Sequence, residues 1–209
     1  MYSSFSRRRL VAVILVLGVV FAPASPVRAA DGTPASRIES FYAALVETMK
    51  QGKQLGIRGR YGKLKPAIET VYDLPGMTSL AVGPSWSGMT PQQQAALIDG
   101  FTHMTIATYA RNFADYSGER FDVDPNVETR NAQRIVRTLL TPPDKEVVSL
   151  AYLMRQIGAD WKIIDVYYQG NISQLAARRS EFSATLKSGG ADALQQKLKE
   201  LGDRLLAGR

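Results

Sequence analysis

The chain has 209 residues, of which 45% are hydrophobic and 22% charged, with a formal net charge of +7. This composition is typical of a globular chain of one domain and excludes collagen-like and intrinsically disordered proteins. The absence of cysteine excludes disulfides, thiolate nucleophiles and metal sites built on thiols.

The N-terminus carries the pattern of a secretory signal peptide. Three consecutive arginines precede an uncharged apolar run at residues 10–21, and small residues up to Ala29 offer a cleavage site. The run is shorter than the about 20 apolar residues that a permanent membrane anchor needs. We therefore predict a cleaved leader at residues 1–29 and a single domain at residues 30–209. Loss of the four arginines of the leader would leave a net charge of about +3, which suits weak attraction to anionic surfaces and not nucleic-acid binding.

The first half of the mature chain has helical periodicity. Apolar residues recur at spacings of three and four over residues 38–49 and again over residues 97–116. The second stripe follows Thr90, which begins a capping box. Two short helices are expected between these stripes, at residues 66–72 and 76–82.

Residues 53–65 alternate glycines with arginines and lysines and contain no acid. Because glycine disfavours helix, we predict a mobile basic loop there. It is either a solvated connector or a contact for lipid headgroups or an acidic partner.

The second half changes to strand signals. Segments rich in β-branched and aromatic residues alternate with turn sequences, which predicts an antiparallel meander with strands at residues 121–124, 127–130, 134–140, 146–157 and 161–168. Helical periodicity returns at residues 172–186, and a last helix follows Gly189 and Gly190. Helices, strands and helices in this order indicate an α+β fold.

The last two predicted strands are largely apolar on both faces. Leu150, Tyr152 and Met154 lie on one face of their strand, and Ala151 and Leu153 lie on the other. Two explanations remain open. Helices cover both faces, or one face lines a cavity that holds an apolar ligand.

No set of residues typical of an active site stands out. His103 is the only histidine and has no cysteine or acid pair beside it, so we predict no metal site and no cofactor. The sequence contains no glycine-rich phosphate loop and no nucleophile elbow. Asp165, between apolar residues, could act as a base, although a strand aspartate more often pairs with an arginine or a backbone donor. We predict no enzymatic activity. The alternatives are a small-molecule enzyme with Asp165 as its base and an adaptor that binds no ligand.

Several short motifs follow one another in an order that resembles a known family: Gly59-Arg60-Tyr61, Tyr72-Asp73-Leu74, Trp86, Tyr116-Ser117-Gly118 and Trp161-Lys162-Ile163-Ile164-Asp165-Val166. Together they resemble the MlaC-type family of periplasmic phospholipid-binding proteins, also called the toluene-tolerance auxiliary family, over nearly the whole mature chain. Arg178 stands where the family usually has a tyrosine, which makes this variant similar to the hopanoid-associated branch.

The resemblance implies a curved antiparallel sheet of the NTF2-like or cystatin-like kind, backed by helices, with an apolar cavity between sheet and helices. It implies a monomeric periplasmic carrier of a phospholipid or hopanoid. Its partners would be an inner-membrane ABC transporter with an MCE-domain ring and an outer-membrane lipoprotein complex. We expect the cavity to be lined by Met77, Leu97, Phe101, Met104, Tyr109, Val136, Leu150, Tyr152, Met154, Ile164, Val166 and Tyr168. We expect headgroups or a partner to contact Arg58, Arg60, Lys63 and Arg179.

Overall fold

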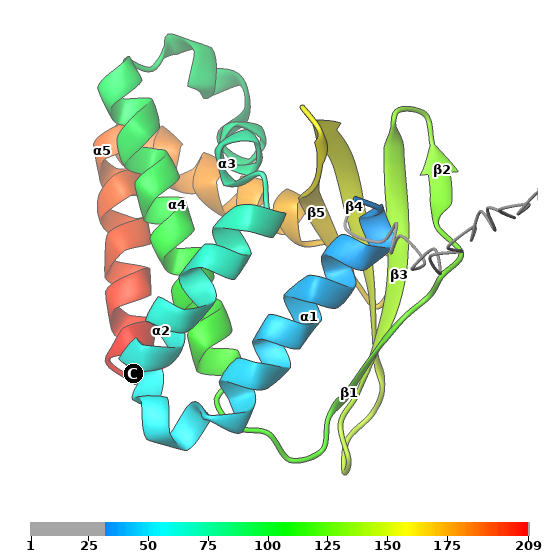
Figure 1. Cartoon of the computed structure of the whole chain (residues 1–209). Coiled ribbons are helices and arrows are strands. Elements are labelled where there is room, and N and C mark those ends of the chain that lie inside the picture. The colour runs from blue at the N-terminus through cyan, green and yellow to red at the C-terminus, as the bar shows by residue number, and fades with distance from the viewer. Residues whose placement is uncertain (1–31, 209) are drawn as a thin grey trace, which may run out of the picture.

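The computed structural model describes residues 32–208, so the predicted leader at residues 1–29 lies outside the described residues and stays a prediction. Helices gather on one side of a sheet (Figure 1). The helical elements are α1 (Pro34–Lys50), α2 (Gly52–Val71), α3 (Leu74–Val82), the 3-10 turn η1 (Gly83–Gly88), α4 (Pro91–Asn112) and α5 (Gln174–Leu206). No described helix combines the length and the hydropathy that a membrane crossing requires.

Residues 32–208 contain six strands that form one antiparallel sheet, which confirms the predicted α+β fold and meander. They are β1 (Arg120–Val123), β2 (Glu128–Arg130), β3 (Gln133–Thr141), β4 (Val148–Ile157), β5 (Asp160–Tyr168) and β6 (Ile172–Ser173). The order is β1-β3-β4-β5-β6, and β2 also pairs with β3. Each predicted strand from residue 121 to residue 168 is present, with its ends shifted by only a few residues.

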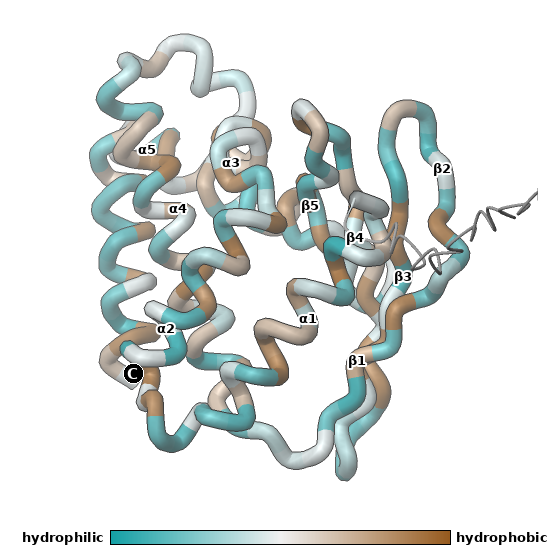
Figure 2. The backbone as a smooth tube through the Cα atoms, viewed as in Figure 1, coloured by the Kyte–Doolittle hydropathy of each residue, from teal (hydrophilic) through white to brown (hydrophobic). Residues whose placement is uncertain are grey.

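The strand register places side chains of neighbouring strands in rows on the face that meets the helices, here called the inner face. One row contains Thr138, Leu150 and Tyr168, and the next contains Val136, Tyr152 and Val166. The main core packs between this face and the helices. Figure 2 shows hydrophobic residues recurring along α1, which crosses the sheet on this side.

A smaller apolar cluster lies on the opposite, outer face of the sheet. It consists of Ile135, Ala151, Leu153 and Ile164, with Tyr167 packed against it. Residues 151 and 153 alternate with the inner-face residues 150, 152 and 154, as side chains along a strand do. The sheet is therefore apolar on both faces. Its inner face packs against the helices as part of the main core, and its outer face carries the smaller cluster.

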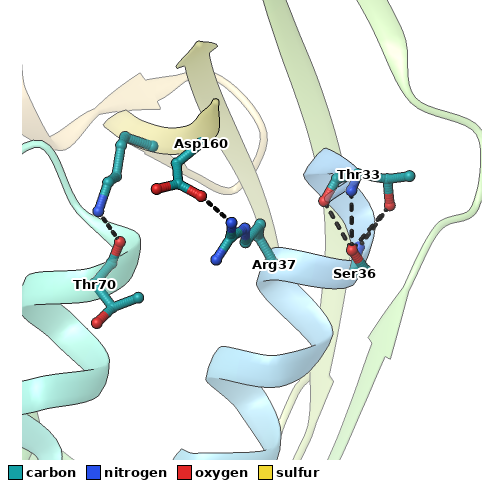
Figure 3. A network of polar contacts seen from close by, with 6 residues as sticks. Thr33, Ser36, Arg37, Thr70 and Asp160 are labelled. Atoms are coloured by element: carbon teal, nitrogen blue, oxygen red, sulfur yellow. Dashed lines mark hydrogen bonds and ion pairs between the residues drawn. The ribbon is translucent and has the colours of Figure 1, made fainter. Parts of the chain in front are cut away.

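Polar contacts join the first helices to the β4–β5 hairpin (Figure 3). Thr33 caps α1 through a capping box with Ser36, which satisfies backbone donors at the helix start. One turn later Arg37 pairs with Asp160 at the hairpin. Lys162 of β5 donates to the carbonyl of Thr70 in α2. These contacts fix the end of the sheet that carries the hairpin against α1 and α2.

The prediction of a loop at residues 53–65 is wrong, because this segment is helical within α2. Gly56, with φ of 59°, supplies a kink in α2 that other residues rarely adopt. A Cβ at Gly52 would lie 1.9 Å from the carbonyl oxygen of Ala114, so only glycine permits this close approach. Leu64 and Ile68 are fully buried. Their burial offsets the about 1 kcal/mol that each helical glycine costs.

The predicted start of the helix after Thr90 and the predicted helical C-terminal segment are confirmed in outline. Thr90 caps α4 through a capping box with Gln93. The two predicted last helices run on as α5, with a break at Gly190, where φ is 70°. Ile172 was expected to begin the first of these helices. It lies in β6 instead, where it pairs with Tyr168 of β5. Ser173 then caps α5 by accepting a hydrogen bond from the Ala176 amide at 2.9 Å.

Candidate functional site

A cavity of about 380 Å³ lies between the inner face of the sheet and the helices. Side chains of α1, α3, α4, α5 and strands β1, β3, β4 and β5 line it, and most of them are apolar. The cavity reaches solvent where β5 ends, because Tyr168 in its wall is 42% exposed. The wall residues Met77, Tyr72 and Tyr152 are buried and form the inner end of the cavity, here called its closed end. The arrangement is an apolar pocket that leads from a mouth near Tyr168 into the core.

The structure places most of the predicted lining residues in the cavity wall. Eight of the twelve line it: Met77, Phe101, Met104, Tyr109, Leu150, Tyr152, Val166 and Tyr168. Leu97, Val136 and Met154 are fully buried in the core without reaching the cavity, so their placement was wrong. Ile164 was also misplaced, because it belongs to the outer cluster. The β4–β5 register shifts between Leu153 and Met154, and such a bulge interrupts the alternation of faces.

The prediction missed eight apolar or aromatic lining residues and five polar ones. Thr105, Thr108 and Asn112 line the cavity from α4. They follow Phe101 at helical spacing, four, seven and eleven residues later, so the periodicity could have identified them. Gln174 and Arg178 join them from the first turns of α5. An interpretation based on apolar residues alone leaves such positions out.

Four tyrosines converge at the closed end of the cavity, one each from α1, the end of α2, α4 and β4. The Tyr42 hydroxyl lies 2.9 Å from that of Tyr152 and 2.7 Å from Oγ1 of Thr138. The Tyr72 and Tyr109 hydroxyls hydrogen-bond each other. Burial is the largest cause that raises the pKa of each of the four phenols. They therefore stay neutral and keep their protons at any ordinary pH.

The four predicted headgroup contacts lie outside the cavity wall, and for Arg60 the prediction is wrong. Arg60 is only 9% exposed, and its guanidinium donates to the carbonyls of Ala110 and Gly52, both at 2.8 Å. Lys63 pairs with Glu47 at 2.6 Å. Arg58 and Arg179 are exposed. The cation in the cavity wall is Arg178, the position at which this sequence departs from the usual family tyrosine.

The two residues considered for chemistry are held by structural hydrogen bonds. The buried Asp165 carboxylate accepts from the Val166 amide at 2.8 Å, the Leu175 amide at 3.0 Å and the Ser173 hydroxyl at 2.6 Å. It thus ties the start of α5 to β5 and does not line the cavity. His103 bonds Tyr61 and Asp203 on the helical side. Within residues 32–208 no three His, Asp or Glu side chains gather as a metal site would require.

Comparison with known proteins agrees with this geometry. The sequence profile of the MlaC protein family matches residues 39–200. The chain belongs to the MlaC family. It is 24% identical over 134 residues to the toluene tolerance protein Ttg2D of Pseudomonas putida, a match that covers 63% of this chain and 61% of that protein. The chain thus spans less than two thirds of this MlaC relative's length.

A solved structure shares the fold of this MlaC-family chain. It is a phospholipid-binding protein from Ralstonia solanacearum in complex with a phospholipid. The TM-score is 0.72 at 24% identity, and the similarity covers 82% of this chain and 97% of the other. The predicted family and fold are therefore confirmed, whereas the hopanoid-associated branch stays a prediction.

Proposed function

We propose that this MlaC-family protein carries a membrane lipid, with the hydrocarbon of the lipid inside the cavity and its polar head at the mouth. The observation that carries the proposal is the apolar cavity between sheet and helices. The phospholipid complex of the Ralstonia solanacearum protein, which has the same fold, supports it. The proposal assigns no reaction to the chain, in keeping with the structural engagement of Asp165.

The energetics require a ligand of this kind to be enclosed. Exposing hydrocarbon costs about 0.8 kcal/mol per methylene, so two acyl chains of about 30 methylenes in total would cost on the order of 20 kcal/mol in water. The cavity volume of about 380 Å³ lies at the lower end of the range for ligand pockets, about 300–1,000 Å³. A lipid with two long chains would therefore have to widen it. If dry and empty, the present void would cost about 9 kcal/mol at about 24 cal/mol per Å³, which is comparable with the whole stability of a domain.

The first test follows from that cost. We expect the purified protein to retain lipid, because an occupied cavity avoids the penalty of a void. Organic extraction followed by mass spectrometry should find close to one lipid per protein and identify it as a phospholipid or a hopanoid. A preparation without extractable lipid that also takes up none from vesicles would contradict the carrier proposal.

We propose that Arg178 contacts the headgroup at the mouth. The side chain of Arg178 is 33% exposed and lies one helical turn from Glu181, with which it pairs at 2.9 Å. The Leu175 and Ala176 amides at the start of α5 are not available to a phosphate, because Asp165 and Ser173 already accept from them. Arg178 is the cation in the described cavity wall. Its guanidinium can exchange the Glu181 carboxylate for a phosphate group.

Arg178→Gln should therefore weaken the uptake of anionic phospholipid. We expect about a 3- to 10-fold loss, less than for a buried charged hydrogen bond, because the group is partly exposed and already paired. The measurement is loading of delipidated protein from phosphatidylglycerol vesicles. Arg179→Gln is the matched control, since it removes the same charge from the next, exposed position and should leave loading unchanged. Equal effects of the two substitutions would exclude a specific contact.

The carrier proposal has consequences for where the protein is located and for which partners it contacts. We propose a periplasmic location, which is supported by the leader pattern at residues 1–29 and by membership of the MlaC family. The inner-membrane transporter and the outer-membrane lipoprotein complex implied by the resemblance stay predictions, as does the monomeric state. Cross-linking in intact cells would test the partners, and loss of lipid transfer without any cross-link to either complex would argue against them.

A further inference from the structure

The closed end of the cavity carries a cluster of tyrosine hydroxyls. Tyr42 hydrogen-bonds Tyr152 and Thr138, and Tyr72 hydrogen-bonds Tyr109. All four tyrosines line the cavity, at the end away from the exposed Tyr168. Their rings pack edge to face or tilted against one another and against Phe41, which holds the hydroxyls in place.

A count of donors shows that these hydrogen bonds leave O–H groups unused. Five hydroxyls bring five O–H donors, and each also accepts. Their three hydrogen bonds use three donors. Tyr42 donates to Tyr152 and therefore accepts from Thr138, so the Tyr152 O–H and the O–H of either Tyr72 or Tyr109 have no acceptor among these bonds. Buried donors in proteins nearly always have a partner, and these three tyrosines line the cavity.

A saturated hydrocarbon end cannot supply such an acceptor. A neutral oxygen, as in a hydroxyl, ether or carbonyl group, can accept from a spare O–H, and a hydroxyl can also donate to the phenols. An anion does not fit as well, because no cation of the described chain lines this end and burying an unpaired charge is costly. The geometry thus selects one uncharged oxygen at the buried tip of a largely hydrocarbon ligand.

We propose that the tyrosine cluster is a specificity subsite for lipids whose buried end carries a neutral oxygen group. The proposal rests on the carrier function, since it names the lipid that the same cavity prefers. The cluster then has two roles. It forms the inner end of the cavity and it favours lipids with oxygen at the far end over plain acyl chains.

The test compares two sets of probes that differ only at the tip. Delipidated protein is titrated with dodecanoic, tetradecanoic and hexadecanoic acids and with their ω-hydroxy derivatives. In a wholly apolar cavity the added hydroxyl weakens binding, because burial removes its water. With the subsite, we expect at least one ω-hydroxy acid to bind about 3- to 10-fold more tightly than its parent, which corresponds to about one net hydrogen bond.

Variants then assign the preference to the cluster. The variant in which Tyr42, Tyr72, Tyr109 and Tyr152 are all replaced by Phe removes every phenol hydroxyl of the cluster and should abolish the preference while keeping affinity for the plain acids. Tyr167→Phe on the outer face of the sheet is the control and should keep it. Should the fourfold variant not fold, the wild-type comparison alone decides. Plain acids that bind as tightly as the ω-hydroxy acids at every length would overturn the subsite and leave the carrier proposal intact, whereas no binding of any acid or phospholipid would remove both.

Discussion

Leu150→Arg should empty the protein of lipid without unfolding it. Leu150 lies on the inner face of β4, partly buried in the cavity wall, and its neighbour in the same row is Tyr168, which is exposed at the mouth. An arginine there can extend its charged end toward the mouth while its stem fills the cavity. A hydrocarbon chain cannot share the cavity with that charge. We expect at least a 10-fold fall in lipid per protein, measured by mass spectrometry of extracts.

Two comparison variants give this prediction its controls. Leu139→Arg places the same side chain on the outer face of β3, where Leu139 is 45% exposed, and should leave both lipid content and melting temperature unchanged. Met154→Arg places it in the fully buried core and should unfold the protein. A Leu150→Arg protein that folds and carries as much lipid as the wild type would show that lipid binds elsewhere.

The strands and most helices were predictable because their patterns are local. Alternating β-branched residues, the turn at residues 158–160 and the capping box at Thr90 each depend on a few neighbouring residues. The break before the last helix was equally clear, since Gly190 supplies the positive φ angle at that point. Such signals need no knowledge of the rest of the fold.

The error at residues 53–65 has a different origin. Counting glycines gives the local cost of a helix, but the helix is stabilised by contacts with distant residues. Leu64 and Ile68 pack in the core, and Gly52 meets Ala114, more than sixty positions away in the sequence. Gly56, one of the glycines that suggested a loop, is the glycine that the kink requires. No spacing rule distinguishes these two uses of glycine.

The cavity was predictable only in part, because the faces of the strands follow from local periodicity but the extent of the cavity does not. Periodicity identifies which side chains share a face of a strand, and Leu150, Tyr152 and Val166 lie in the cavity wall. How far the cavity extends along a row depends on packing across the fold, and so Met154 and Val136 were wrongly included. The hydrogen-bonded tyrosine cluster could not be foreseen, because its members come from four elements that only the fold brings together.

Arg60→Met should destabilise the protein strongly, whereas Arg58→Met on the same helix should not. Arg60 donates to the carbonyl of Ala110, one of the last four carbonyls of α4, which lack partners within the helix. A cation at a helix C-terminus is also favoured by the helix dipole. Its second bond, to the Gly52 carbonyl, ties the start of α2 to the same place. Arg60 thus serves as a cap for α4 that is supplied by another helix.

The size of the effect follows from what methionine leaves behind. Methionine keeps the apolar stem but leaves two buried carbonyls without their charged donor, so we expect a loss of about 2–4 kcal/mol. For a domain of this size the melting temperature should fall by about 5–15 °C. The melts should be recorded on delipidated protein, because bound lipid raises the melting temperature of whatever variant carries it.

The comparison with Arg58→Met separates structure from surface charge. Both substitutions remove one positive charge from α2, but Arg58 is exposed, so its replacement should cost no more than about 0.5 kcal/mol. If Arg60 acted on anionic membranes instead, the two variants would have similar melting temperatures and would slow transfer to anionic vesicles alike. A large fall in melting temperature for Arg60→Met alone would show that this arginine, which in the sequence looks like part of a basic surface, holds two helices together from within.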